Sequence, residues 1–146
     1  MRRPHGRRLT EATICYSYRG PLQAAPMLCV LIVDDNEMVK QTIRGMLEPN
    51  GYRIMEADNV ASALQVLSDD RVDLLLTDLH MPGGNGLEIV RKGRRQHPGL
   101  KVIAMSGTGE ASDQLATASN LGAHAVIGKP FRSKELLALI ATVLAR

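Results

Sequence analysis

The stretch VDLLLTD, residues 72–78, with LHMPGGNG directly after it, residues 79–86, decides the fold of this chain. An apolar run leads into one acid, Asp78, and the chain then turns through Pro82 and several glycines. Proline and glycine favour turns and not the interior of an element. A carboxylate in this position is therefore expected at the mouth of a sheet rather than in its core.

Two other apolar strands end in chemically active residues. Residues 28–33 lead into Asp34 and Asp35, and residues 124–127 lead through a glycine into Lys129 and a proline. In a parallel α/β sheet the carboxyl ends of the strands share one edge, and ligands bind there. Together with Asp78, three carboxylates and one lysine are thus expected at one edge, which indicates a metal-assisted phosphoryl site.

Strands and helices alternate regularly from residue 28 onward. Asn59 is expected to cap the second helix, Ser133 is expected to cap the fifth, and Pro49-Asn50-Gly51 ends the first. Five strands alternating with five helices predict an α/β fold with a doubly wound, five-stranded parallel sheet. The expected strands cover residues 28–33, 52–56, 73–77, 100–105 and 124–127, and the helices 36–48, 60–69, 86–96, 111–120 and 133–145.

Positive charge is concentrated before residue 27. Residues 1–26 hold five arginines against one glutamate, a balance of +4, so the remaining residues carry −1 of the total +3. The folded part therefore gives little support for nucleic-acid binding by this domain. Residues 1–26 show no sustained periodicity, and we expect a disordered basic extension there and one domain over residues 27–146.

Two alternatives remain for the extension. Translation that starts at Met27 would make it extra coding sequence. A basic anchor for nucleic acid or membrane is the other, but no aromatic residues alternate with the arginines and no amphipathic helix is apparent. No apolar run approaches the ~18 residues of a membrane span, and no apolar segment follows the arginines as in a secretory signal. We expect a cytoplasmic domain without membrane contact.

Each candidate residue also has a plain structural explanation. Asp34 or Asp35 would cap the first helix, Asp78 would form a turn, and Lys129 would only pair with Asp78. Ser106, at the end of the fourth strand, would be an ordinary loop residue. None of these explains why the residues gather at one edge, because packed like charges repel unless they bind a cation. A hard divalent ion with oxygen ligands, Mg²⁺, fits this set.

Residues 28–146 resemble the receiver domain of two-component response regulators over essentially their whole length, and in size they are close to the single-domain chemotaxis regulators. The resemblance implies a flavodoxin-like (βα)5 fold with strand order 2-1-3-4-5. The motifs that carry it are, in order, Ile32-Val33-Asp34-Asp35, Thr77-Asp78-Leu79-His80-Met81-Pro82 with Gly86, Met105-Ser106-Gly107, and Gly128-Lys129-Pro130-Phe131.

By this resemblance Asp78 is the phosphoacceptor, and Ser106 and Lys129 bind phosphoryl oxygens. Asp34, Asp35, Asp78 and the backbone carbonyl of His80 would hold Mg²⁺. A sensor histidine kinase or a histidine phosphotransfer protein would supply the phosphoryl group. The resemblance further implies that the domain is no ordinary enzyme. It catalyses its own phosphotransfer, slowly dephosphorylates itself, and signals through a conformational switch.

The resemblance leaves the partners and the roles of four residues open. We expect a stand-alone receiver, a monomer or weak dimer, that docks on a downstream protein which the sequence does not identify. Val126 stands where the family usually has an aromatic switch residue, and Gly84 and Asn85 stand where a hydrophobe and an acid are common. The His80 side chain would either position water or screen the phosphoryl group.

Two rival functions fit the motifs less well. A phosphatase of the haloacid dehalogenase type needs an acid two residues after its nucleophile, where this chain has His80. A flavin-binding, flavodoxin-like module needs a phosphate loop of small polar residues after the first strand, where Asp34 and Asp35 would repel a phosphate. The basic run Arg91, Lys92, Arg94 and Arg95 is interpreted as a solvated helix face, and His124 has no partner at metal-ligand spacing.

Overall fold

The computed structural model describes residues 27–81, 84–107 and 112–146, with side chains described for all of these except 84–85 and 112–115. The expected disordered extension, residues 1–26, lies outside the described residues and stays a prediction. So does the division of the chain into an extension and one domain.

Five parallel strands form the central sheet, as predicted. Their order is β2-β1-β3-β6-β7, which is 2-1-3-4-5 when the five strands are counted along the chain. The register places Val33 beside Thr77 and Asp78 beside Met105, so the carboxyl ends of the strands lie at one edge. The strands are β1 (Cys29–Val33), β2 (Arg53–Ala57), β3 (Leu74–Asp78), β6 (Lys101–Ser106) and β7 (Ala125–Gly128).

A small hairpin that the sequence did not predict follows β3. It consists of β4 (His80–Met81) and β5 (Gly84–Asn85), which pair antiparallel. Two-residue strands are too short to show the alternation of apolar and polar residues by which a strand is recognised.

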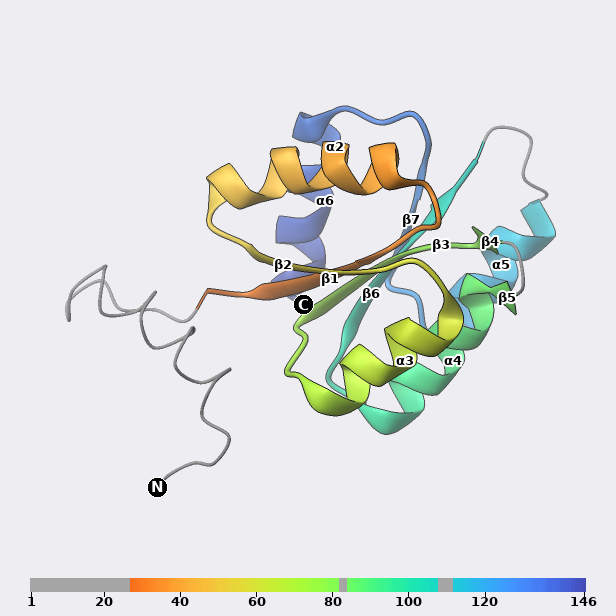
Figure 1. The fold of residues 1–146 in the computed structure, drawn as a ribbon. Coiled ribbons are helices and arrows are strands. Elements are labelled where there is room, and N and C mark those ends of the chain that lie inside the picture. Colours follow the sequence, from red (N-terminus) through yellow and green to blue (C-terminus); the bar gives the residue numbers. More distant parts are fainter. Residues whose placement is uncertain (1–26, 82–83, 108–111) are drawn as a thin grey trace, which may run out of the picture.

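Helices cover both faces of the sheet (Figure 1). The helices α2 (Glu37–Leu47) and α6 (Ser133–Leu144) pack on one face, and a short 3₁₀ helix, η2 (Glu48–Asn50), follows α2. The other face carries α3 (Val60–Asp69), α4 (Gly86–Gln96) and α5 (Ser112–Asn120). This layering explains why the central strands β1 and β3 are apolar along most of their length, since a strand covered on both faces needs no polar side.

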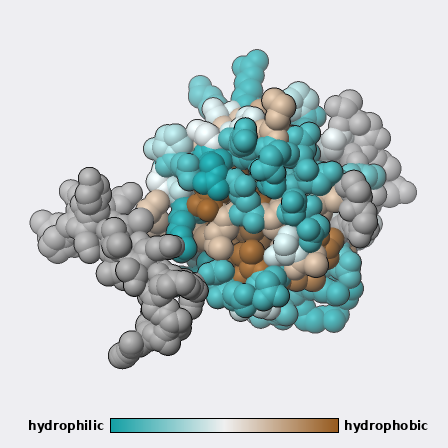
Figure 2. Space-filling model, in the orientation of Figure 1, coloured by the Kyte–Doolittle hydropathy of each residue, from teal (hydrophilic) through white to brown (hydrophobic). Residues whose placement is uncertain are grey.

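Two aliphatic cores lie between the sheet and its helices. Val30 and Ile32 of β1 face α2 and α6, whereas Leu31 and Val33 face the three helices on the opposite side. Side chains on one strand alternate between faces, so one short strand contributes to both cores. Figure 2 shows the result from outside: polar side chains cover most of the surface, and apolar ones gather near the middle, between the two helix layers.

The helices begin close to the expected residues, but only one of the expected caps, Asn59, is confirmed. Asn36 caps α2, where its side-chain oxygen accepts from two backbone N–H groups at 2.9 and 3.2 Å, so neither Asp34 nor Asp35 is the cap. Asn59 caps α3 as predicted. The expected cap Ser133 is wrong, because it is the first residue inside α6.

Arg132 occupies the cap position of α6 instead. Its backbone N–H donates to the carboxylate of Glu135 at 2.8 Å, which is one half of a capping box. No helix in the described part of the chain is long and apolar enough to cross a membrane.

His124 ties the start of β7 to β6. Its backbone N–H donates to the Val102 carbonyl at 2.7 Å, and its Nδ1 accepts from the Val102 N–H at 3.1 Å. Burial lowers the pKa of this imidazole below its ordinary value of 6.5, and the positive charges of Arg94, Lys101 and Arg146 lower it further. The histidine thus stays neutral in the folded protein at a pH where an unfolded histidine would be charged.

This depressed pKa predicts a loss of stability in mild acid. Above pH 6.5 the imidazole is neutral in both states, and as the pH falls below that value the unfolded chain takes up the proton first. The variant His124→Asn keeps an acceptor for the Val102 N–H and does not titrate. Its melting temperature should therefore fall less between pH 7.5 and pH 5.5 than that of the parent, measured by thermal unfolding. Equal decreases in the two proteins would contradict this explanation.

Candidate functional site

The four strand ends bring the predicted side chains together. Asp34 follows β1 directly, Asp78 ends β3, Ser106 ends β6, and Lys129 follows β7. Asp34, Asp78 and Ser106 are 1%, 5% and 6% exposed, so these polar groups are buried at the sheet edge rather than spread over the surface. Buried polar groups are costly unless they are paired, and this edge therefore needs compensating contacts.

Lys129 supplies the compensating charge. Its Nζ lies 2.9 Å from Asp34 Oδ2 and 3.3 Å from Asp78 Oδ2, so one ammonium bridges both buried carboxylates. Its backbone N–H donates to the Ser106 carbonyl at 2.7 Å, and the bond to Pro130 is cis. The lysine is thus held through its main chain as well as its side chain.

Burial and neighbouring charges together shift the pKa values of Asp78 and Lys129. Burial raises the pKa of Asp78 above its ordinary value, and the neighbouring Asp34 also raises it. The backbone N–H of His80 and the Lys129 ammonium act against this rise. Burial would lower the pKa of Lys129, but its hydrogen bond to Asp34 and the charge of Asp78 outweigh burial and raise it. The lysine therefore stays charged.

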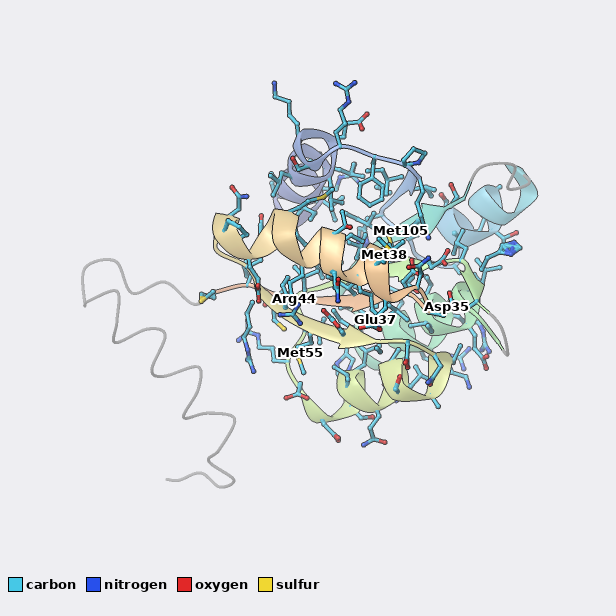
Figure 3. The ribbon with its side chains drawn as sticks, turned by 45° about the horizontal axis from the view of Figure 1, so that its top comes forward. Asp35, Glu37, Met38, Arg44, Met55 and Met105 are labelled. Atoms are coloured by element: carbon cyan, nitrogen blue, oxygen red, sulfur yellow. The ribbon has the colours of Figure 1, made fainter. Side chains whose placement is uncertain are left out.

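Asp35 adds a third carboxylate on the solvent side. It lies at the sheet edge where β1 passes into α2, near Glu37 and Met38 (Figure 3). Asp34, Asp35 and Asp78 each offer one oxygen, and these three oxygens lie within 4.8 Å of one another. A compact set of carboxylate oxygens, one of them exposed to solvent, suits a hard divalent cation that keeps some of its waters.

His80 reaches the site through its backbone. Its N–H donates to Asp78 Oδ1 at 3.1 Å, which orients the carboxylate, while its side chain is exposed. The role of its carbonyl oxygen as a metal ligand stays a prediction.

The surroundings of Ser106 leave room for an incoming group. A Cβ built on Gly128 would lie 3.9 Å from the Ser106 hydroxyl oxygen, and one built on Gly107 would meet nothing within 4 Å. Space is therefore open beside Gly107, at the edge of the sheet where Ser106 and Lys129 lie.

One buried cation was missed by sequence reasoning. Lys40 is 4% exposed on α2, and its Nζ lies 2.9 Å from Glu37 Oε1. The i, i+3 spacing of Glu37 and Lys40 was the available signal. It was missed because only apolar residues had been assigned to the inner face of this helix.

Gly86 lets the hairpin close beside the site. A Cβ on this residue would overlap the carbonyl oxygen of Asp78 and lie 2.9 Å from its carbonyl carbon. Only glycine fits here, because a side chain would push α4 away from β3.

We expect Gly86→Ala to destabilise the protein by about 1–3 kcal/mol, the usual cost of overpacking, and to disturb Asp78. Gly45→Ala is the matched control: it lies inside α2 with nothing within 4 Å of its Cβ. That change should stabilise by up to about 1 kcal/mol, since alanine is the better helix former. Chemical denaturation of both variants would check this, and a Gly86→Ala protein as stable as the parent would show that the close contact is not required.

Comparison with known proteins agrees with this geometry. The family model of the response regulator receiver domain matches residues 30–141. The chain belongs to the response regulator receiver family. The match favours this family over the phosphatase and flavodoxin alternatives.

Several relatives are similar to this chain. The KDP operon transcriptional regulatory protein KdpE of Escherichia coli (strain K12) is 36% identical over 120 residues, which cover 82% of this chain and 52% of that protein. The phosphate regulon transcriptional regulatory protein PhoB of Pseudomonas aeruginosa is 34% identical over 119 residues, which cover 80% of this chain and 52% of that protein. The chain thus spans about half the length of the curated relatives it matches.

Solved structures share the fold. A CheY-like response regulator receiver domain protein from Methanospirillum hungatei JF-1 has a TM-score of 0.78 and 28% identity, and the match covers 82% of this chain and 94% of that one. A response regulator receiver domain protein from Clostridium thermocellum has a TM-score of 0.77 and 26% identity, and the match covers 82% of this chain and 96% of that one.

Proposed function

We propose that this domain accepts a phosphoryl group on Asp78 from the phosphohistidine of a sensor histidine kinase or a histidine phosphotransfer protein. The observation that carries the proposal is the bridge from Lys129 to Asp34 and Asp78 at the open edge of the sheet. It places a nucleophilic carboxylate beside a cation that can shift to an incoming oxyanion.

The transfer is a displacement at phosphorus. A carboxylate oxygen of Asp78 forms a bond to phosphorus while the bond from phosphorus to the histidine nitrogen breaks. The electron pair of that bond stays on the imidazole, which takes a proton from solvent. Lys129 then pairs with a phosphoryl oxygen, and the Ser106 hydroxyl donates a hydrogen bond to another.

The acidic cluster fits a Mg²⁺ ion at this step. Asp34, Asp35, Asp78 and the backbone carbonyl of His80 would hold it. When bound, the ion neutralises negative charge on the phosphoryl oxygens. Asp34 keeps a role of its own, because its Oδ1 accepts from the Asn36 N–H at 2.9 Å and so stays aimed at the site.

The donor protein has a surface to contact next to Lys129. A groove of about 410 Å³ opens there between α2 and the start of the segment that leads to α6. Its lining is mostly apolar and includes Met38, Val39 and Phe131. A partner that covers this groove would bring its phosphohistidine to the edge where Asp78 lies.

Signalling follows from the loss of one ion pair. Once Asp78 carries the phosphoryl group, Lys129 has a new partner, and a two-state change involving the loop after β6, α5 and β7 is the proposed response. Val126, half-buried on β7, packs against the core under α3–α5 and has no ring to swing. Output would then rest mostly on the loop after Ser106 and on α5.

In this proposal the domain acts alone, as a monomer or weak dimer. It docks on a downstream protein rather than on nucleic acid. The acyl phosphate should be hydrolysed slowly in the same pocket. The domain would thus catalyse its own phosphorylation and slowly dephosphorylate itself.

Labelling with acetyl phosphate and Mg²⁺ tests the proposal. One base-labile phosphoryl group should appear, and mass spectrometry of peptides should place it on Asp78. Asp78→Asn should abolish labelling, because an amide is no equivalent nucleophile, whereas the control Asp69→Asn, an exposed acid at the end of α3, should label like the parent. Labelling of Asp78→Asn to the parental extent would refute the assignment.

A further inference from the structure

Figure 1 shows the opposite end of the sheet, where β6 and β7 begin and where the C-terminal end of the chain lies. Hydrogen bonds connect a second group of charged residues there. We name it the basic cluster. Its members come from four elements: Arg94 from α4, Lys101 from the start of β6, His124 from just before β7, and Arg146 from the segment after α6.

The hydrogen bond from Val102 fixes the tautomer of His124. Because the Val102 N–H donates to Nδ1 at 3.1 Å, Nδ1 holds a lone pair and the ring hydrogen of the neutral imidazole is on Nε2. The side chain is partly exposed. The ring therefore offers one N–H donor in a fixed orientation.

The three cations of the cluster are anchored by backbone oxygens. Arg94 Nη1 donates to two carbonyl oxygens of the loop before β6, one of them at 2.9 Å. Arg146 Nη1 donates to the His124 carbonyl at 2.9 Å, and Lys101 Nζ donates to a backbone oxygen of Arg146 at 2.9 Å. In the part of the chain that the structure describes, none of these three forms an ion pair with a side-chain carboxylate. Each cation keeps further donors, since a guanidinium has five N–H groups and an ammonium three.

The position of Arg94 is also fixed by packing. A Cβ on Gly122 would lie 2.9 Å from Arg94 Cγ and Nε, so the arginine stem lies directly on this glycine. Gly122 has a φ of +119°, a conformation that glycine adopts without strain. The guanidinium is thus held in place before any ligand arrives.

The charge around His124 is positive. The three charged side chains that act on the imidazole, from Arg94, Lys101 and Arg146, are all cations. An excess of positive charge remains even if the Arg146 oxygen that Lys101 contacts belongs to a carboxylate, because three cations then face one anion. A preformed group of cations with a fixed N–H donor is suited to a multiply charged oxyanion.

We propose that the basic cluster binds a phosphate-type oxyanion with at least two negative charges, either as an inorganic ion or as part of a nucleotide. The site is separate from the phosphorylation site, because Lys101 and Ser106 are at opposite ends of β6, about 17 Å apart at the usual rise per residue. The ligand touches no residue of the phosphorylation site, so its binding does not depend on phosphorylation.

Titration of ¹⁵N-labelled protein with pyrophosphate, without Mg²⁺ and at constant ionic strength, tests the proposal. The amide signals of Val102 and His124 and the imidazole Nε2–H signal should shift together and saturate. Binding should also raise the pKa of His124, because a bound anion opposes the three cations. Acetate should bind at least about tenfold more weakly, a difference of about 1.4 kcal/mol. A parallel titration with ATP distinguishes an inorganic ion from a nucleotide as the ligand. Equal affinities for ATP and pyrophosphate mean that the phosphates suffice. Tighter binding of ATP means that the nucleoside adds contacts.

Charge-matched variants decide whether the basic cluster is responsible for pyrophosphate binding. The double variant Lys101→Gln/Arg146→Gln should weaken pyrophosphate binding at least about tenfold. Arg132→Gln/Lys134→Gln, at the exposed start of α6, removes the same two charges and should change affinity less than about twofold. Equal weakening in both double variants, or shifts spread over the whole surface, would show general attraction to positive charge and overturn the proposal.

The variant Asp78→Asn distinguishes pyrophosphate binding at the basic cluster from the proposed phosphoacceptor function. That variant should bind pyrophosphate as the parent does. Shifts centred on residues 34–35 and 78, instead of on Val102 and His124, would place the anion at the other end of the sheet and also overturn the proposal.

Discussion

The ion pairs from Lys129 to Asp34 and Asp78 are the interaction on which the functional edge of this domain depends. Two buried carboxylates close together repel each other, and an uncompensated buried charge costs several kcal/mol. One ammonium at 2.9 and 3.3 Å pairs with both carboxylates and offsets part of their repulsion. The backbone bond from Lys129 to Ser106 keeps the lysine there, so its contacts connect the ends of four strands, β1, β3, β6 and β7. In the proposed phosphotransfer, the same lysine would pair with a phosphoryl group in exchange for a carboxylate.

The fold supplies this arrangement because of its topology. A parallel sheet covered on both faces can expose polar groups only at the ends of its strands, and the order 2-1-3-4-5 places β1, β3, β6 and β7 side by side in the order needed. Gly86 allows α4 to begin directly beside Asp78. At the opposite ends of β6 and β7 the charge has the opposite sign, so the two ends of one sheet suit a cation and an oxyanion respectively.

The sequence predicted the strands, the helices and the residues at the edge, because apolar runs that end in Asp34, Asp78 and Lys129 are strong local signals. Three other features were not predicted, for different physical reasons. The hairpin β4–β5 is too short to show a pattern, and the Arg132 cap of α6 depends on a neighbouring acid rather than on its own side chain. The role of His124 depends on Val102, which is 22 residues away.

Measurement of Mg²⁺ affinity in the variant Lys129→Gln tests the central claim most directly. If Lys129 is the resident counter-ion of Asp34 and Asp78, its removal leaves carboxylates without a competing cation. Mg²⁺ should then bind more tightly, by about tenfold or about 1.4 kcal/mol, while labelling by acetyl phosphate becomes slower. Lys92→Gln, which removes a surface ion pair with Glu88, should change neither quantity. Unchanged or weaker Mg²⁺ binding in Lys129→Gln would contradict the account.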